Sequence, residues 1–152
     1  MRFWDSSALM AFVVQEPTSE TLDKLLREDD SIAVWWGAWV ECAVAISRLL
    51  REGWLDEQGE GEARASLDLL AEDWREVQPT DEVRALAALL SRRQPLRAAD
   101  ALQLAAAFVW RENTDEHRGF VCLDERLRRA ASEEGFNVLP RSPEMSEVGG
   151  TK

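Results

Sequence analysis

The chain has 152 residues, of which 45% are hydrophobic and 31% are charged, and this length and composition suit a single folded domain. Its 29 Asp and Glu residues outnumber its 18 Lys and Arg residues, and the net charge of −11 argues against a protein that binds nucleic acid through its overall charge. The longest uncharged apolar run covers only residues 32–40, whereas a membrane helix needs about 20 residues. Asp5 lies where a signal peptide would need its apolar stretch, so we expect a cytoplasmic protein that does not bind a membrane.

The pattern of residue types alternates between strand and helix along the chain. In chain order we predict a strand at 2–4, helices at 8–14 and 18–28, a strand at 31–35, helices at 37–50, 54–73, 80–90 and 96–110, a strand at 119–123, a helix at 125–134 and an extended segment at 136–139. This alternation is typical of βα units, so we expect an α/β fold with a mainly parallel central sheet flanked by helices on both faces. The domain is expected to cover residues 1–140, and residues 141–152 to form a disordered tail.

The negative charge is concentrated in one segment. Residues 52–82 hold eleven acids and two bases, so this segment carries −9 of the total of −11. Outside it, acids and bases nearly balance, and local groups of arginine could therefore still contact phosphate. The other interpretation is that these arginines lie on solvated helix faces, where they pair with nearby acids. The groups are Arg92, Arg93 and Arg97, and Arg126, Arg128 and Arg129.

The helix predicted at 37–50 has apolar or small residues on most of its faces, and we expect it to be largely buried. Three tryptophans of the same apolar window are expected in the core or at a dimer interface, namely Trp35, Trp36 and Trp39. Cys42 and Cys122 lie in apolar windows without CxxC spacing and are expected to be small core residues, not a disulfide or a zinc site. Any metal ion would therefore have to be bound by oxygen atoms.

Two acids occupy helical windows that are otherwise uncharged. Glu41 is the only charged residue in 32–46, and Asp100 is the only one in the helix segment that follows Arg97. Burying an unpaired carboxylate costs several kcal/mol, so each of these acids must be protonated, paired or bound to a cation. The structural alternative is a buried ion pair with an arginine such as Arg48 or Arg97.

Two further acids each close a short apolar strand and precede a helix. Asp5 and Asp124 are therefore expected at the carboxyl ends of strands, which is the edge where open α/β sheets bind ligands. The alternative for both residues is a purely structural role as the N-cap of the following helix.

Each of the four acids stands in a recognisable block of sequence. The blocks are Asp5-Ser6-Ser7-Ala8-Leu9, Val40-Glu41, Leu96-Arg97-Ala98-Ala99-Asp100-Ala101-Leu102-Gln103-Leu104-Ala105 and Phe120-Val121-Cys122-Leu123-Asp124-Glu125-Arg126-Leu127. In order and separation they resemble the four acidic motifs of PIN-domain ribonucleases, particularly the VapC toxins of bacterial and archaeal toxin–antitoxin pairs. The chain departs from that family pattern at Gln103, where a histidine is frequent, and at Cys122, where a threonine is frequent.

The resemblance implies a single PIN-like domain, with the four acids converging at one edge of the sheet and Mg²⁺ or Mn²⁺ bound there. It also implies a hydrolase, an endoribonuclease that cleaves single-stranded RNA, forms a homodimer and is silenced by a cognate antitoxin protein. Hard divalent cations prefer carboxylate and water oxygens, and such an ion activates water and neutralises charge on a phosphate.

Roles for individual residues follow from this resemblance. Asp5 and Asp100 are expected to be the primary metal ligands, and Glu41 and Asp124 to be outer or water-mediated ligands. The first carboxylate is expected to be oriented by Ser6 or Ser7. The arginines expected to steer the RNA backbone are Arg97, Arg126, Arg128 and Arg129.

Three other functions compete with a nuclease. A haloacid-dehalogenase phosphotransferase needs a second Asp two positions after the first, where this chain has Ser7. A response-regulator receiver needs a lysine after a late strand, and neither Lys24 nor Lys152 follows one. The remaining alternative is a catalytically weak PIN-fold binding module that acts through protein or RNA contacts, with the acidic segment 52–82 as its docking surface.

Overall fold

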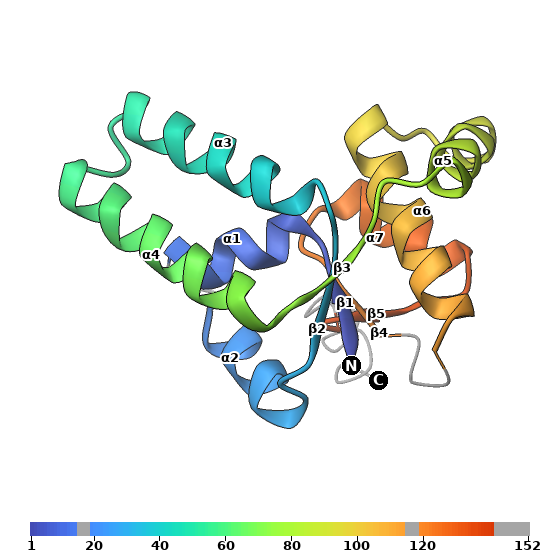
Figure 1. Ribbon diagram of the computed structural model, residues 1–152, viewed down its shortest axis with the longest axis horizontal. Coiled ribbons are helices and arrows are strands. Elements are labelled where there is room, and N and C mark those ends of the chain that lie inside the picture. Colours follow the sequence, from blue (N-terminus) through green and yellow to red (C-terminus); the bar gives the residue numbers. More distant parts are fainter. Residues whose placement is uncertain (15–18, 115–118, 142–152) are drawn as a thin grey trace, which may run out of the picture.

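A computed structural model describes residues 1–14, 19–114 and 119–141, and it places five strands between two groups of helices (Figure 1). The elements are β1 (Arg2–Trp4), α1 (Ser6–Val14), α2 (Ser19–Glu28), β2 (Ile32–Trp35), α3 (Ala38–Arg51), α4 (Glu57–Asp73), β3 (Arg75–Val77), α5 (Asp81–Arg93), α6 (Ala98–Glu112), β4 (Gly119–Val121), α7 (Glu125–Glu133) and β5 (Asn137–Leu139). The predicted tail lies outside the described residues, except for Arg141. No helix in the described part of the chain is long and apolar enough to cross a membrane.

The five strands form one sheet in the order β3-β2-β1-β4-β5, and every neighbouring pair is parallel. The expected α/β fold with a mainly parallel sheet is therefore confirmed. β1 lies in the centre, and the chain connections run outward from it in opposite directions, through β2 on one side and β4 on the other. The crevice outside the carboxyl ends of two such strands is where open α/β sheets bind ligands.

Alternate residues of the strands build two separate cores, because successive side chains of a strand point to opposite faces of the sheet. Phe3 and Phe120, which are register partners with ring centroids 5.5 Å apart, face α5, α6 and α7. Trp4 and Val121, the next residues along each strand, pack instead with α1, α2, α3 and α4. Helices therefore cover both faces of the sheet, as the sequence predicts (Figure 1).

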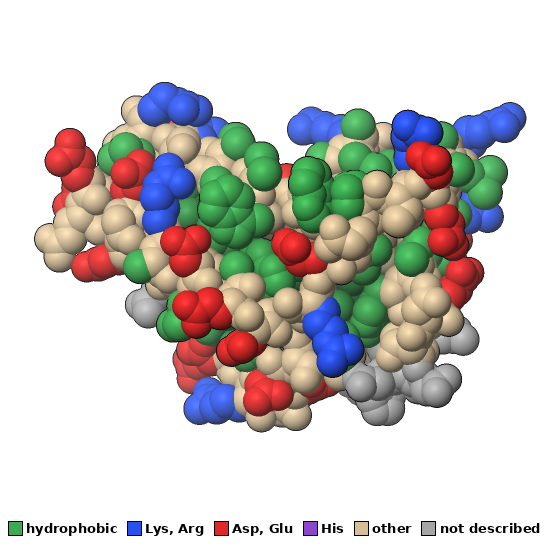
Figure 2. All heavy atoms as spheres, viewed as in Figure 1, with side chains coloured by type: hydrophobic (Ala, Val, Ile, Leu, Met, Phe, Trp, Pro, Cys, Tyr) green, Lys and Arg blue, Asp and Glu red, His purple; other side chains and the backbone are tan. Residues whose placement is uncertain are grey.

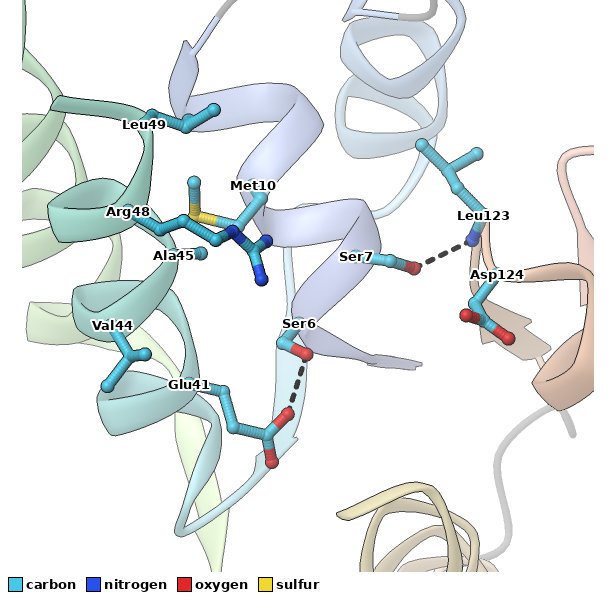
Figure 3. Close-up of a pocket in the computed structure, with 10 residues that line it drawn as sticks. All are labelled: Ser6, Ser7, Met10, Glu41, Val44, Ala45, Arg48, Leu49, Leu123 and Asp124. Atoms are coloured by element: carbon cyan, nitrogen blue, oxygen red, sulfur yellow. Dashed lines mark hydrogen bonds between the residues drawn. The ribbon is translucent and has the colours of Figure 1, made fainter. Parts of the chain in front are cut away.

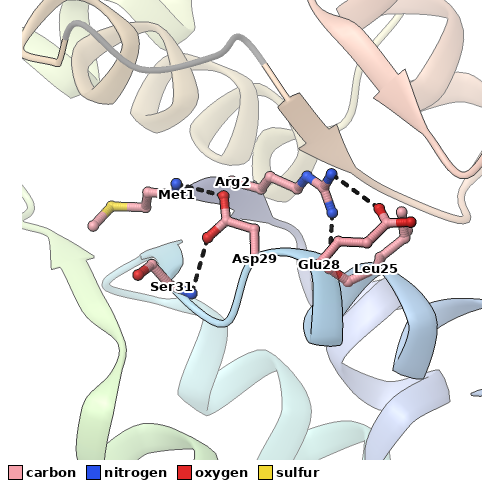
Figure 4. Close-up of polar contacts among 6 residues, drawn as sticks. All are labelled: Met1, Arg2, Leu25, Glu28, Asp29 and Ser31. Carbon is pink, nitrogen blue, oxygen red and sulfur yellow. Dashed lines mark hydrogen bonds and ion pairs between the residues drawn. The ribbon is translucent and has the colours of Figure 1, made fainter.

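Polar contacts at its amino end fix the position of β1 against α2 (Figure 4). The terminal amine of Met1 donates to Asp29 at 2.6 Å. The Arg2 guanidinium donates to the carbonyl oxygen of Leu25 at 2.8 Å and to the Glu28 carboxylate at 3.3 Å. These contacts anchor the amino end of the central strand, whose other end leads into the first of the four acidic blocks.

The sequence patterns did not predict β3, because this strand has no apolar alternation. Arg75 and Glu76 are exposed, and only Val77 is partly buried. β3 pairs with β2 alone and forms an edge of the sheet. Charged side chains are common on edge strands, where they discourage pairing with another chain. The same charged residues remove the apolar alternation from which a strand is predicted.

The prediction that the 37–50 helix is largely buried was wrong. α3 buries one stripe, formed by Ala38, Cys42 and Ile46, which recur every four residues and pack with the core that contains α1 and α4. Val40 and Val44 are 53% and 57% exposed on the side away from this stripe. Apolar residues on most faces suggested burial, but the neighbouring helices cover only one face of α3.

The three neighbouring tryptophans are not equally buried. Trp35 is in the core, whereas Trp36 and Trp39 are exposed, so the expectation of a core position is wrong for these two and an interface position stays a prediction. Figure 2 shows hydrophobic side chains on both sides of a hollow in the surface, between α3 and the α5–α6 pair. Large apolar side chains left exposed in this way are typical of surfaces that contact another molecule.

Candidate active site

Asp5 directly follows β1, and Asp124 lies three residues after the end of the paired strand β4, which stops at Val121 and is shorter than the predicted strand at 119–123. Both acids therefore lie at the carboxyl ends of strands, as the sequence predicts. Both also cap the helix that follows. The backbone N–H of Ala8 donates to Oδ1 of Asp5 at 3.2 Å, and that of Leu127 donates to Oδ1 of Asp124 at 3.0 Å. The structural role as an N-cap is therefore real for both residues, and it leaves the second oxygen of each carboxylate outside the cap.

The Asp5 carboxyl group is buried, with only 2% of the residue exposed. Burial raises the pKa of Asp5 to about 6, although hydrogen bonds from Ser7 and Ala8 act in the opposite direction. The Ser7 hydroxyl donates to Asp5 at 2.7 Å and accepts from the backbone N–H of Leu123 at 2.9 Å (Figure 3). Ser7 therefore links the first acid to the segment that carries Asp124. That it orients Asp5 for a reaction stays a prediction.

Glu41 projects from the first turn of α3 and is half-buried. Its Oε2 atom accepts from the Ser6 hydroxyl at 2.7 Å and from Nε2 of Gln103 at 3.3 Å. Burial raises the pKa of Glu41, and the charge of Asp100 raises it further. The alternative of an ion pair with Arg48 is not formed, and both hydrogen bonds end on one oxygen, so Oε1 of Glu41 is left for a ligand.

Gln103 is a residue whose role sequence reasoning missed. It is almost completely buried in α6, and of the described polar groups only Glu41 bonds to its side chain. The signal in the sequence is a lone amide side chain three residues after Asp100 on an alanine-rich helix. In the family pattern this position stands out only as a departure, because a histidine is frequent there. In this chain the departure provides a hydrogen bond to the second acid.

Asp100 lies in the first turn of α6 and is half-buried. Burial raises the pKa of Asp100 and the charge of Asp124 raises it further, while the nearby charges of Arg97 and Arg126 partly offset this. Glu41, Asp100 and Asp124 thus come from three separate segments, and Asp100 lies within electrostatic reach of both Glu41 and Asp124. The acids gather at one edge of the sheet, beside the end of β1 that carries Asp5.

The model of the PIN domain family matches residues 2–140. The chain belongs to the PIN domain family. Members of this family are generally nucleases, and the resemblance seen in the four acidic blocks is thereby confirmed. No curated protein matches the sequence.

Solved structures resemble this PIN domain in fold. One of them is VapBC2 from Rickettsia felis, bound to a DNA fragment from the VapBC2 promoter. It is 13% identical to this chain with a TM-score of 0.58, and the match covers 86% of this chain and 93% of that one. PAE2754 from Pyrobaculum aerophilum is 20% identical with a TM-score of 0.60, covering 97% of this chain and 92% of the other. FitAcB from Neisseria gonorrhoeae is 15% identical with a TM-score of 0.60, covering 92% and 97%.

The four arginines expected to steer RNA occupy different environments in this PIN domain. Arg97 and Arg126 are exposed and act electrostatically on Asp100. Arg128 instead donates from its two terminal nitrogens to the carbonyl oxygens of Cys122 and Pro140, both at 2.6 Å. It therefore joins the end of β4 to the end of β5. The remaining one, Arg129, is exposed and forms no hydrogen bond with a described residue.

The two cysteines of the PIN domain are buried and unpaired, as predicted. Burial raises the pKa of the Cys42 thiol to about 12, and the charges of Glu41 and Asp5 add to this. Burial and the charge of Asp5 also raise the pKa of Cys122, whose sulfur lies 3.9 Å from the Ser7 hydroxyl. Both thiols are therefore protonated at neutral pH. Oxygen atoms are then the available ligands for a metal ion at this site.

Among the described residues, no group of three or more His, Cys, Asp or Glu side chains is arranged to hold a metal ion. Asp5 is turned toward Ser7 and Ala8, and Glu41 toward Ser6 and Gln103. The four carboxylates are therefore not arranged to bind one metal ion directly all at once. Mg²⁺ usually keeps several waters and uses only one or two carboxylates, so the oxygen donors of this PIN domain still fit a hydrated hard divalent cation.

A cavity of about 460 Å³ opens beside these acids, between α1, α3 and the turn from β4 to α7 (Figure 3). Glu41 and Asp124 line it from opposite sides, and Arg48 extends across it from α3 toward α1. Its apolar lining includes Met10, Leu49 and Leu123. The cavity thus combines acids, a cation and an apolar wall in one hollow.

Proposed function

We propose that this PIN-domain protein is a metal-dependent endoribonuclease that cleaves single-stranded RNA and acts in the cytoplasm as the toxin of a toxin–antitoxin pair. The observation that carries the proposal is the gathering of four acids from four segments at the carboxyl edge of the sheet. Asp5 and Asp124 follow adjacent strands, while burial raises the pKa of Glu41 and repulsion from the charge of Asp100 adds to this rise. Repulsion between nearby carboxylates destabilises a folded protein unless a bound cation offsets it.

In this proposal Asp5 and Asp100 bind Mg²⁺ or Mn²⁺ directly, and Glu41 and Asp124 act as outer ligands. A bound divalent cation of this kind lowers the pKa of a water molecule and neutralises charge on the phosphate that is attacked. The protein's own contribution is to orient the carboxylates before the substrate arrives. Ser7 holds Asp5 in place, as Ser6 and Gln103 hold Glu41, so that little reorganisation is needed during the reaction.

The arginines that lie beside Asp100 would bind the RNA backbone. Arg97 precedes α6 and Arg126 lies in α7, on two elements that meet near the same carboxylate. An acidic site repels phosphate, so positive side chains beside it are needed to hold the substrate. Arg128 is a weaker candidate because its guanidinium already bonds two carbonyl oxygens.

We also propose that the protein forms a homodimer and binds a cognate antitoxin. The exposed apolar side chains of Trp36, Trp39 and Val40 support a protein contact, and a fold neighbour is VapBC2 bound to promoter DNA. Analytical ultracentrifugation should give twice the 17.2 kDa mass of one chain. Val40→Glu should lower that mass toward a monomer, whereas a wild-type monomer at all concentrations would reject the dimer.

The decisive experiment is cleavage of a labelled single-stranded RNA with Mg²⁺, with Mn²⁺ and with EDTA, run beside Asp5→Asn and Asp100→Asn. Metal-dependent cleavage by the wild type that both folded variants lack would establish the nuclease. If all three proteins are equally inert and calorimetry detects no Mn²⁺ binding, the protein is a binding module with structural acids. In that case Asp5→Asn would still bind the partner that co-purifies with the wild type.

A further inference from the structure

The cavity beside Glu41 and Asp124 is also lined by an arginine, Arg48, that has no role in the proposed cleavage of RNA. Arg48 is exposed and forms no hydrogen bond or ion pair with any residue that the structure describes. It follows Glu41 by seven residues, about two helical turns, so both side chains leave the same face of α3 about 10 Å apart along its axis. The guanidinium is therefore directed into the hollow that Glu41 also lines (Figure 3).

The wall next to Arg48 is apolar. Met10 of α1, Leu49 of α3 and Leu123 after β4 line the cavity together with the acids. A flat group with apolar faces fits such a wall, and an anionic group fits the arginine. One nucleotide of a single strand has both parts, a base and a phosphate, and an arginine fork binds phosphate through two parallel hydrogen bonds.

We infer that this cavity binds the nucleotide next to the cleaved phosphate, with its phosphate on Arg48 and its base against Met10, Leu49 and Leu123. The inference rests on the proposed nuclease function. RNA is favoured over a peptide because the cavity is continuous with Glu41 and Asp124, so a strand whose phosphate reaches these acids must place its neighbouring nucleotide close by. Arg48 is in this view a substrate-binding residue and takes no part in bond cleavage.

Binding is tested in the Asp100→Asn background, where cleavage is blocked, with a labelled oligoribonucleotide at several NaCl concentrations. Arg48→Ala should raise the Kd on the order of tenfold and lower the slope of log Kd against log salt by about 0.7, the value for one lost phosphate contact. Arg48→Lys should restore the salt slope but only part of the affinity, because lysine cannot form the two-pronged contact. The protein with Arg48 intact should bind an oligonucleotide with abasic sites more weakly than one that carries all its bases.

Arg51→Ala is the matched control. Arg51 ends the same helix, is also exposed, and is not among the residues that line the cavity, so its loss removes the same charge without removing the contact. Equal effects of Arg48→Ala and Arg51→Ala would overturn the inference, since a general loss of positive charge would then explain both. So would an unchanged RNA affinity of Arg48→Ala together with lost binding of a co-purified antitoxin, which would make the cavity a protein-docking site.

Steady-state cleavage separates this inference from the proposed function. With residues 5 and 100 intact, Arg48→Ala should raise KM about tenfold and leave kcat nearly unchanged. A fall in kcat at constant KM would contradict a binding role. If the wild type cleaves no RNA with Mg²⁺ or Mn²⁺, the nuclease proposal fails, and the oligonucleotide binding series still decides whether Arg48 holds a nucleotide.

Discussion

The β1–α1 and β4–α7 junctions have the same local design but opposite environments. In each, a short strand is followed within three residues by an Asp whose Oδ1 accepts a backbone N–H from the following helix. Asp5 is buried because it follows the central strand, between two cores. Asp124 is exposed at the neighbouring strand. A local motif can therefore place an acid at the sheet edge, while its position in the sheet decides how deeply the acid is buried.

The largest effect that separates the two junctions is expected in catalysis. Asp5→Asn should lower the rate of RNA cleavage at least about hundredfold, because a primary ligand of the proposed ion is lost. Asp124→Asn, at an outer position, should lower it about tenfold. Rates are measured under single-turnover conditions with Mn²⁺. Equal losses in the two variants would remove the proposed distinction between direct and outer ligands.

The next effect is on stability, and it depends on pH. Because the pKa of Asp5 is raised from 3.8 to about 6 in the fold, its neutral form stabilises the protein below pH 3.8, and this contribution is lost as pH rises through 6. In metal-free buffer at pH 8, Asp5→Asn should therefore be more stable than the wild type by up to about 3 kcal/mol. Near pH 4 the difference should vanish.

Urea denaturation of both proteins across this pH range measures the effect. Asp124→Asn is the matched control, and it should change the free energy of unfolding little at either pH, because Asn is as good an N-cap as Asp. An Asp5→Asn protein that is less stable than the wild type at pH 8 would show that the lost hydrogen bonds outweigh the relief of the buried charge.

A smaller difference is expected between two arginines of the β4–α7 junction. Arg128→Ala should destabilise the protein by about 2 kcal/mol, because the carbonyl oxygens of Cys122 and Pro140 lose a charged donor. Arg129→Ala, on the exposed side of α7, should change stability by less than about 0.5 kcal/mol. Thermal unfolding checks both. Equal stabilities would indicate that water replaces the Arg128 contacts without cost.

The smallest effect is expected from the hydroxyl that joins the junctions. Ser7→Ala removes the donor to Asp5 and the acceptor of the Leu123 N–H, and should cost about 1 kcal/mol of unfolding free energy. Ser31→Ala, at an exposed position, should be neutral within about 0.5 kcal/mol. If Ser7→Ala also lowers kcat while KM is kept, the hydroxyl orients Asp5 for the reaction.

The sequence was sufficient to predict features that depend on near neighbours. Apolar runs followed by capping residues located β1, β4 and the acids after them, and helical spacing located the helices. The fold class followed from their alternation. Motif resemblance then predicted that Glu41 and Asp100 join the strand-end acids, and in the structure Asp100 lies within electrostatic reach of Glu41 and Asp124.

Other features depend on which element comes to lie beside a residue, and local patterns do not contain that information. α3 looked buried because its composition is apolar, yet other helices cover it on one side only. Arg128 looked like an RNA contact, but its partner Pro140 lies beyond the next strand. Gln103 and Arg48 gained roles only when α6, α1 and α3 came together around Glu41.

The acidic segment 52–82, most of which forms α4 beside α3, has a consequence for the kinetics of encounter. A polyanion that approaches over α4 is repelled, whereas one that approaches over α6 and α7 passes Arg97 and Arg126. Added salt screens both interactions, with a Debye length of about 10 Å at 0.1 M. We therefore expect salt to reduce the difference between the two directions of approach and to speed dissociation of RNA by weakening the arginine contacts.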